Sequence, residues 1–186
     1  YSTVKTYSAI VNYGNLNVLD SSFSNAVGLR AGIILNYGTL LVNNSEFKNN
    51  SAKYYGGAVT NFGFANIVNS LFESNTAAEG EAILNTYDMF ISNSRFIDNN
   101  ISSNKYQKVE SLIDISSSYF TENSDIFVKD SGIYIKESYV TLINTSNSVV
   151  DISYSFINTY DFVNSRLSID DNLWFSNENI IYPEKI

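Results

Sequence analysis

The sequence predicts an all-β fold, a single-stranded, right-handed parallel β-helix. One pattern recurs about every 24 residues: a large apolar anchor, apolar residues five and seven positions before it, and usually serine two positions before it. Apolar residues alternate within each unit, as on a strand. A unit this short cannot bury its own apolar face, so it must stack on its neighbours. We expect about seven coils, forming one domain over residues 1–186.

The anchors set the register of the predicted coils. Their successive spacings are 24, 25, 24, 24, 20 and 27 residues. The anchors are Phe23, Phe47, Phe72, Phe96, Phe120, Val140 and Leu167. The residues seven and five positions before them are Leu16/Val18, Leu40/Val42, Ala65/Ile67, Met89/Ile91, Ile113/Ile115, Ile133/Ile135 and Tyr160/Phe162. Alternate strand residues face the same side, so each pair predicts a short strand with both members in the core.

A second short strand is expected upstream of each pair in the first coils. It covers 8–12, 32–36, 57–61 and 81–85, and its inward residues lie 13 positions before the anchor: Ile10, Ile34, Val59 and Ile83. Alternation then directs their neighbours outward, namely Val11, Leu35, Thr60 and Leu84. With the anchor segment as a third side, each unit has three short strands. This favours a β-helix over a leucine-rich repeat, which needs a leucine-rich consensus and a helical side.

Asparagine and glycine recur at the predicted turns. The triplets beginning at Asn12, Asn36 and Asn61 read Asn-aromatic-Gly, which is typical of backbone positions with positive φ. A second asparagine follows the anchor by three residues, at Asn50, Asn75, Asn99 and Asn123. Stacked in register, these amides are expected to form an Asn ladder that satisfies the turns of adjacent coils.

The regularity breaks between Asn99 and Leu112. Residues 100–110 replace the expected upstream strand and predict either a protruding loop or a strand in a different register. Later, residues 149–157 are interpreted as the upstream strand of the last coil. Residues 168–186 are expected to form a C-terminal cap, with Trp174 as a plug over the final coil rather than a ligand contact.

Two sets of residues resemble known surface proteins. The Gly-Gly-Ala-Val at 56–59, with Phe-x-x-Asn at 47–50, 72–75, 96–99 and 120–123, resembles the repeats of chlamydial polymorphic outer-membrane proteins. The Asn-, Ser-, Ile- and Tyr-rich repeats are more similar to adhesin-like surface proteins of methanogenic archaea. In those proteins a repeat block often ends with a segment that residues 171–177 resemble, without its second Trp and its Gly. The resemblance implies a secreted, cell-surface β-helix with an adhesion role.

Composition narrows the remaining classes of function. The chain has 26 Asn and 27 Ser but is 44% hydrophobic, which argues against disorder. The net charge of −8 disfavours binding to nucleic acid or to anionic membranes. No apolar run is long enough to span a bilayer, so we expect no membrane insertion by this segment. Because the chain starts within a repeat-like region, we interpret it as a piece of a longer secreted protein.

Catalytic chemistry has few candidate residues. The chain contains no His and no Cys, which removes the commonest general base and the thiol nucleophile. Asp170 and Asp171 are adjacent and would face opposite sides of a strand. Asp88, Asp114 and Asp161 occupy near-equivalent places in the predicted coils but are isolated in sequence. We therefore expect no catalytic residue, no metal and no cofactor.

The sequence favours a binding surface over a catalytic centre. The predicted register stacks Tyr13, Tyr37 and Phe62 in one column beside the outward face of the upstream strands, at about 4.8 Å per coil. Such a column is a plausible platform for sugar rings or a partner protein; alternatively, the rings cover one another or pack under a neighbouring segment. The predicted function is non-catalytic attachment of an extracellular, cell-surface adhesin to another cell or to polysaccharide. The alternatives are a polysaccharide lyase or hydrolase of pectate-lyase-like fold, and a structural stalk.

Overall fold

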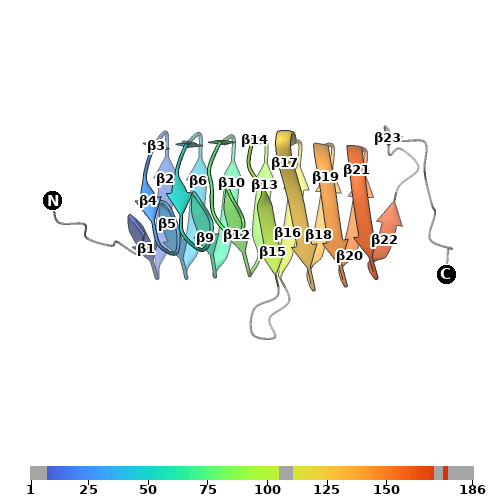
Figure 1. Ribbon diagram of the computed structural model, residues 1–186, viewed down its shortest axis with the longest axis horizontal. Helices are drawn as coiled ribbons and strands as arrows, with labels where there is room; N and C mark the ends of the chain where they lie inside the picture. Colours follow the sequence, from blue (N-terminus) through green and yellow to red (C-terminus); the bar gives the residue numbers. More distant parts are fainter. Residues whose placement is uncertain (1–7, 105–110, 170–173, 176–186) are drawn as a thin grey trace.

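The computed structural model describes residues 8–104, 111–169 and 174–175. Within these ranges all the paired strands are parallel, and no residue is helical. The strands stack one coil after another along a single axis (Figure 1). The predicted parallel β-helix is therefore confirmed. The number of complete coils stays a prediction, because residues at both ends lie outside the described ranges.

The eight-stranded sheet takes one strand from each successive coil. Its strands, in order, are β2 (Asn15–Leu19), β6 (Thr39–Asn43), β10 (Phe64–Val68), β13 (Met89–Ser92), β16 (Leu112–Ser116), β18 (Gly132–Lys136), β20 (Val149–Ser153) and β22 (Arg166–Ile169). Leu16 pairs with Leu40 and Val18 with Val42, and the same alignment continues to Ile133 and Ile135. The predicted inward pairs of the first six coils thus share one register.

A 13-stranded sheet supplies the other sides of the coils. Its first arm consists of β1 (Ile10–Asn12), β5 (Ile34–Asn36), β9 (Val59–Asn61), β12 (Ile83–Asn85) and β15 (Ile101–Asn104). Its anchor arm consists of β3 (Ser22–Ser24), β7 (Glu46–Lys48), β11 (Leu71–Glu73) and β14 (Arg95–Ile97). The two arms meet at β17 (Tyr119–Lys129), and β19 (Tyr139–Ser146), β21 (Phe156–Val163) and β23 (Trp174–Phe175) continue from it.

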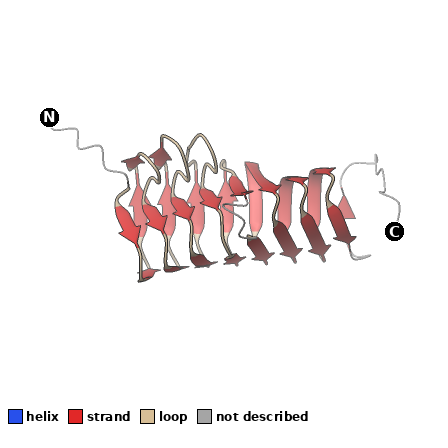
Figure 2. Cartoon of the chain, turned by 90° about the horizontal axis from the view of Figure 1, so that it is seen from below, coloured by secondary structure: helices blue, strands red, loops and turns tan. Residues whose placement is uncertain are grey.

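The coils change shape at β17. Before it, a short connection separates the anchor arm from the first arm; in two coils this connection carries β4 (Val27–Gly28) and β8 (Ser51–Ala52). From β17 onward one long strand replaces the two short strands and their connection. Figure 2 shows long tan connections that arch over the N-terminal coils, whereas the C-terminal coils have only short turns. Three-sided coils therefore give way to shorter, two-sided coils.

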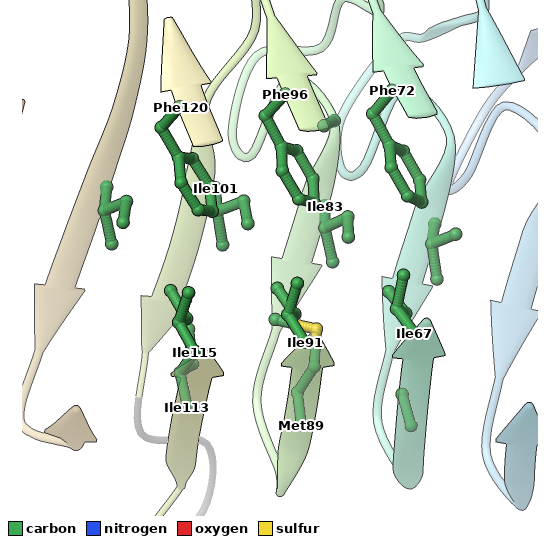
Figure 3. Packing of buried hydrophobic residues seen from close by; sticks show 14 of the residues in the cluster. Ile67, Phe72, Ile83, Met89, Ile91, Phe96, Ile101, Ile113, Ile115 and Phe120 are labelled. Carbon is green, nitrogen blue, oxygen red and sulfur yellow. The ribbon is translucent and has the colours of Figure 1, made fainter. Parts of the chain in front are cut away.

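The anchor phenylalanines form the centre of the core. Phe47, Phe72, Phe96 and Phe120 are fully buried and stack in one column. Figure 3 shows the last three of these rings side by side. Neighbouring ring centroids lie 4.8, 4.8 and 4.5 Å apart, with the planes within 4° of parallel. Val140 pairs with Phe120 and continues the column. The predicted anchor register is confirmed as far as Val140.

The predicted last anchor is wrong. Leu167 pairs with Val150, in the eight-stranded sheet, and does not align with the other anchors. The anchor column continues instead from Val140 to Ile157, only 17 residues later. Tyr160, the expected inward partner of that anchor, pairs with Ile143 in the 13-stranded sheet. A search for a 24-residue period could not find this rung, because two-sided coils need fewer residues.

The same shortening overturns the interpretation of residues 149–157 as one upstream strand. Val149–Ser153 is β20, which belongs to the eight-stranded sheet, and Phe156 begins β21 in the other sheet. Between them Tyr154 adopts a φ of 48°, the left-handed conformation that turns the chain. The expected cap at 168–186 is not tested, because 170–173 and 176–186 lie outside the described residues.

Columns of polar side chains line the interior corners. Asn50 Nδ2 donates to Asn75 Oδ1 at 3.0 Å, and Asn75 Nδ2 donates to Asn99 Oδ1 at 2.9 Å. The Asn ladder is therefore confirmed for these three residues. In the next coil Ser124 continues this column, and the backbone N–H of Asn99 donates to the Ser124 hydroxyl at 3.2 Å. Asn123 lies in β17, but its side chain is outside the described ones.

A second, unpredicted ladder connects the first arm to the eight-stranded sheet. Asn12 Nδ2 donates to Asn36 Oδ1 at 2.7 Å, and the same bond links Asn36 to Asn61 and Asn61 to Asn85. A serine column occupies the position two residues before each anchor, where each backbone N–H donates to the next hydroxyl, as from Ser45 to Ser70. These columns satisfy buried polar groups at turns that every coil must make. The exception among the described residues is Asn99 Nδ2, at the end of the first ladder, which is buried without a partner.

Candidate functional site

The predicted ring column lies at the corner between the first arm and the eight-stranded sheet. Tyr13, Tyr37 and Phe62 each follow an asparagine of the second ladder, so the ladder holds them in register. Asn36 Nδ2, for example, donates to Gly38 O and to Phe64 O, which fixes the turn that carries Tyr37. Stacking of the coils thereby stacks the rings.

The three rings form a partly exposed stack. The centroids of Tyr13 and Tyr37 lie 5.1 Å apart with planes 5° from parallel, and those of Tyr37 and Phe62 lie 5.2 Å apart at 16°. Tyr13 is 77% exposed and Tyr37 38%, whereas Phe62 is half-buried. In the next coil Thr86 occupies the corner position and is buried. The column thus presents its accessible edge at the N-terminal coils.

The sheet face expected beside this column is not free. Leu35, Thr60 and Leu84 were predicted to point outward, but all three are buried; only Val11 is exposed. The connection between the two arms folds back over this face, and Thr60 Oγ1 donates to Arg30 O at 2.8 Å. The predicted alternation is correct, but the connection between the two arms covers the outward side chains. The rings therefore project from a corner rather than lying beside an open sheet.

The glycines of the Asn-aromatic-Gly turns have a different role from the predicted one. Neither Gly38 nor Gly63 has a positive φ. A Cβ at Gly38 would lie 2.1 Å from Gly14 O, and one at Gly63 would lie 2.2 Å from Gly38 O. Glycine is needed because successive corners touch. Positive φ occurs instead at corner residues such as Asn25 and Asn49.

The outer face of the eight-stranded sheet carries aromatic residues that the sequence reasoning missed. Phe64 and Phe90 are each 36% exposed, and their centroids lie 5.5 Å apart at 38°. They border a shallow depression of about 390 Å³, which Asn66, Ile91, Ser92, Asp114 and Ser116 also line. The middle residue of each inward pair must face outward, and this rule places Phe90 and Asp114 on the surface.

A further group of rings lies on the outer face of the long strands. Tyr119 pairs in register with Tyr139, and Tyr139 with Phe156. The last two rings stack with centroids 5.0 Å apart and planes 4° from parallel. Trp174 pairs with Phe156 through the backbone, but its side chain lies outside the described ones, so its expected role as a plug stays a prediction.

The irregular segment at 100–110 is partly a strand. Ile101–Asn104 forms β15, in which Ile101 is fully buried and pairs with Ile83 and Ile126. Of the two alternatives, a strand is therefore confirmed for 101–104. It keeps the register of the first arm, although it comes earlier in the sequence than the 24-residue period predicts. Residues 105–110 lie outside the described ones.

Carboxylates are scattered over the described surface. Asp114 lies in the eight-stranded sheet and Asp161 in β21, so their near-equivalence in the predicted coils is wrong. Burial raises the pKa of Glu81. A backbone hydrogen bond from Asn100 lowers this pKa, and the negative charges of Asp98 and Asp125 raise it further. Burial also raises the pKa of Asp125. Across the described residues no three acidic side chains gather as a metal site would require.

Comparisons with known proteins add no assignment. Searches against models of protein families, curated proteins and solved structures find no match to the chain. Within the described residues, no helix is long and apolar enough to cross a membrane.

Proposed function

We propose that this β-helix is part of a non-catalytic, adhesin-like protein of the cell surface, of the kind found in methanogenic archaea. In this role the chain attaches a cell to another cell or to polysaccharide. Its ligand contacts the corner column of Tyr13, Tyr37 and Phe62. The acidic net charge of −8 supports a partner that is neither nucleic acid nor an anionic membrane.

The observation that supports this proposal best is the stacked, exposed edge of the column. Tyr13 and Tyr37 keep large rings at the surface, although burying them would stabilise the fold. The second Asn ladder holds both rings, so binding costs little conformational entropy. One ring contributes about 0.5–1.5 kcal/mol beyond its buried area. With many copies of the protein on one cell, these weak contacts would act together and give stable attachment through multivalency.

A structural stalk is the second candidate, and the polar ladders favour it. Three columns of side-chain hydrogen bonds connect successive coils, and such a rod would space a distal domain from the cell. A stalk needs no exposed rings. The two candidates therefore differ in whether removal of the ring column weakens attachment.

A triple variant tests the proposal. Tyr13→Ser, Tyr37→Ser and Phe62→Ser together should reduce attachment of protein-coated beads to cells or to immobilised glycans, with an unchanged circular dichroism spectrum. The matched control replaces three tyrosines outside the column, Tyr54, Tyr55 and Tyr154, which are 43%, 36% and 57% exposed. Equal attachment by the wild type and the column variant would discard the column as the binding surface.

A further inference from the structure

We propose that the depression on the outer face of the eight-stranded sheet is a second, separate binding site for a neutral hexopyranose unit of a saccharide. Its rings are Phe64 and Phe90, and its polar groups are Asn66, Asp114 and Ser116. The site lies on another side of the coil from the corner column, and it stands whether or not that column binds a ligand.

Sheet register determines the shape of the site. Phe90 pairs with Asn66 on one neighbouring strand and with Asp114 on the other. All three face outward, so the ring lies between an amide and a carboxylate whose strands are about 10 Å apart, or two strand spacings. Phe64 is tilted 38° against Phe90 and forms one wall. A sugar that stacks on Phe90 therefore has hydrogen-bonding groups on both sides.

The polar side chains of this site have no partner among the residues that the structure describes. Inward asparagine and serine side chains form the ladders that close the turns. Asn66, Ser92, Asp114 and Ser116 instead make no side-chain hydrogen bond or ion pair within the described residues. All four are half-buried, and they surround two half-exposed rings. Unpaired donors and acceptors around an apolar floor match a ligand with apolar faces and a polar rim.

Charge selects the class of saccharide. Among the described residues that border the depression, Asp114 is the only charged one, and it repels uronates, sulfated sugars and phosphates. The nearest cation in register is Lys136, opposite Ser116, and Glu137 pairs with it at 3.5 Å. Flat apolar peptide ligands are less suitable, because they would leave the carboxylate and the amide desolvated and unpaired. A neutral sugar satisfies these groups with its hydroxyls.

The test measures binding of three named probes by calorimetry: β-1,4-linked glucose and mannose hexamers, and an α-1,4-linked galacturonic acid hexamer. At least one neutral hexamer should bind, and the galacturonic acid hexamer should bind more weakly. Asp114→Asn should weaken binding about tenfold, since a hydrogen bond to a charged group is lost. Phe90→Ala should weaken it roughly fivefold or more. Asp114→Asn should leave the unfolding midpoint unchanged. Phe90→Ala also removes a partly buried ring from its contact with Phe64, and it should shift the midpoint far less than truncation of the fully buried Phe72.

Two controls make the result specific. Tyr119→Ala removes a 56% exposed ring from the other sheet and should leave binding unchanged. The triple variant at Tyr13, Tyr37 and Phe62 should also keep its affinity for the hexamer, which separates this site from the corner column. The proposal is overturned if neither neutral hexamer binds, if galacturonate binds as tightly, or if Tyr119→Ala weakens binding as much as Phe90→Ala.

Discussion

Side chains of a single type take opposite roles in this molecule according to the direction in which they point. Inward phenylalanines form the stacked core, whereas Phe64 and Phe90, on the same coils, border an open depression. Inward asparagines form ladders, whereas Asn66 has no partner within the described residues. The two-residue period of the strands separates structural from candidate binding residues.

The core role of the phenylalanine column can be measured at Phe72. Phe72→Ala should lower the free energy of unfolding by about 3–5 kcal/mol, because it leaves a cavity between Phe47 and Phe96. Denaturant unfolding measures this loss. Leu71→Ala, the outward neighbour, is the matched control and should cost far less. A loss at Phe72 below about 1 kcal/mol would remove the column from the core.

The Asn ladder has its own signature at Asn75. This side chain accepts from Asn50 and donates to Phe47 O and Asn99 Oδ1, all in the interior. Asn75→Ala leaves these partners buried and unsatisfied and should cost about 1–3 kcal/mol. Asn66→Ala removes an asparagine without internal partners and should be close to neutral. Equal midpoints for the two variants in urea would show that the ladder adds nothing to stability.

Acid should stabilise the fold through Glu81 and Asp125. Burial raises both pKa values above those of the unfolded chain. Between the unfolded and folded pKa values the native state binds more protons than the unfolded chain does. The stability that Glu81 and Asp125 contribute is therefore fully present below the unfolded pKa, and it is lost as the pH rises through the folded pKa. Glu81→Gln with Asp125→Asn should therefore gain stability relative to the wild type between pH 4 and pH 7.

Denaturant unfolding at both pH values checks this sign. Asp161→Asn removes one exposed negative charge on β21 and controls for the general effect of net charge. If the double variant gained no more than this control between pH 4 and pH 7, burial of Glu81 and Asp125 would not penalise their charged forms.

At the scale of the elements, successive coils touch closely at the corner of Gly14, Gly38 and Gly63. Gly38→Ala should destabilise by about 1–3 kcal/mol, because its Cβ would meet Gly14 O at 2.1 Å. Gly14→Ala is the matched control, since nothing lies within 4 Å of its Cβ. Thermal unfolding of the pair measures the effect. Similar losses in both variants would attribute them to backbone conformation instead of coil-to-coil contact.

The elements also show what sequence could predict. The 24-residue pattern identified the inward residues of the three-sided coils, because each rung repeats the same apolar spacing. It failed at Leu167, because the coil after Val140 repeats after only 17 residues and its anchor, Ile157, is not aromatic. It also failed for Leu35 and Thr60, because period-two alternation says nothing about a connection that folds over the outer face.

The candidate sites were predictable to different degrees. The ring column at Tyr13 and Tyr37 follows from repeated spacing, and the structure stacks these rings. The depression around Phe90 combines outward residues of three adjacent strands, which lie about 24 residues apart in sequence. No local motif unites them, so only the register of the sheet brings them together.

At the scale of the whole molecule, the β-helix is a stiff rod with its hydrogen-bonding ladders inside and its aromatic groups on separate outer faces. Attachment and turnover make different demands on such a surface. Attachment needs rings and polar groups in fixed positions, whereas glycoside hydrolysis needs two carboxylates about 5–10 Å apart on one face. Asp114 and Asp161 lie on different sheets.

One measurement tests the central claim, that this chain binds and does not turn over its ligand. The purified protein is incubated with insoluble polysaccharides and with whole cells, and retention is measured alongside reducing ends and unsaturated products. We expect retention that falls in the variant lacking Tyr13, Tyr37 and Phe62, with no product above the level of a protein-free control. Product that accumulates in proportion to the protein added would contradict the account, as would the absence of retention on every surface.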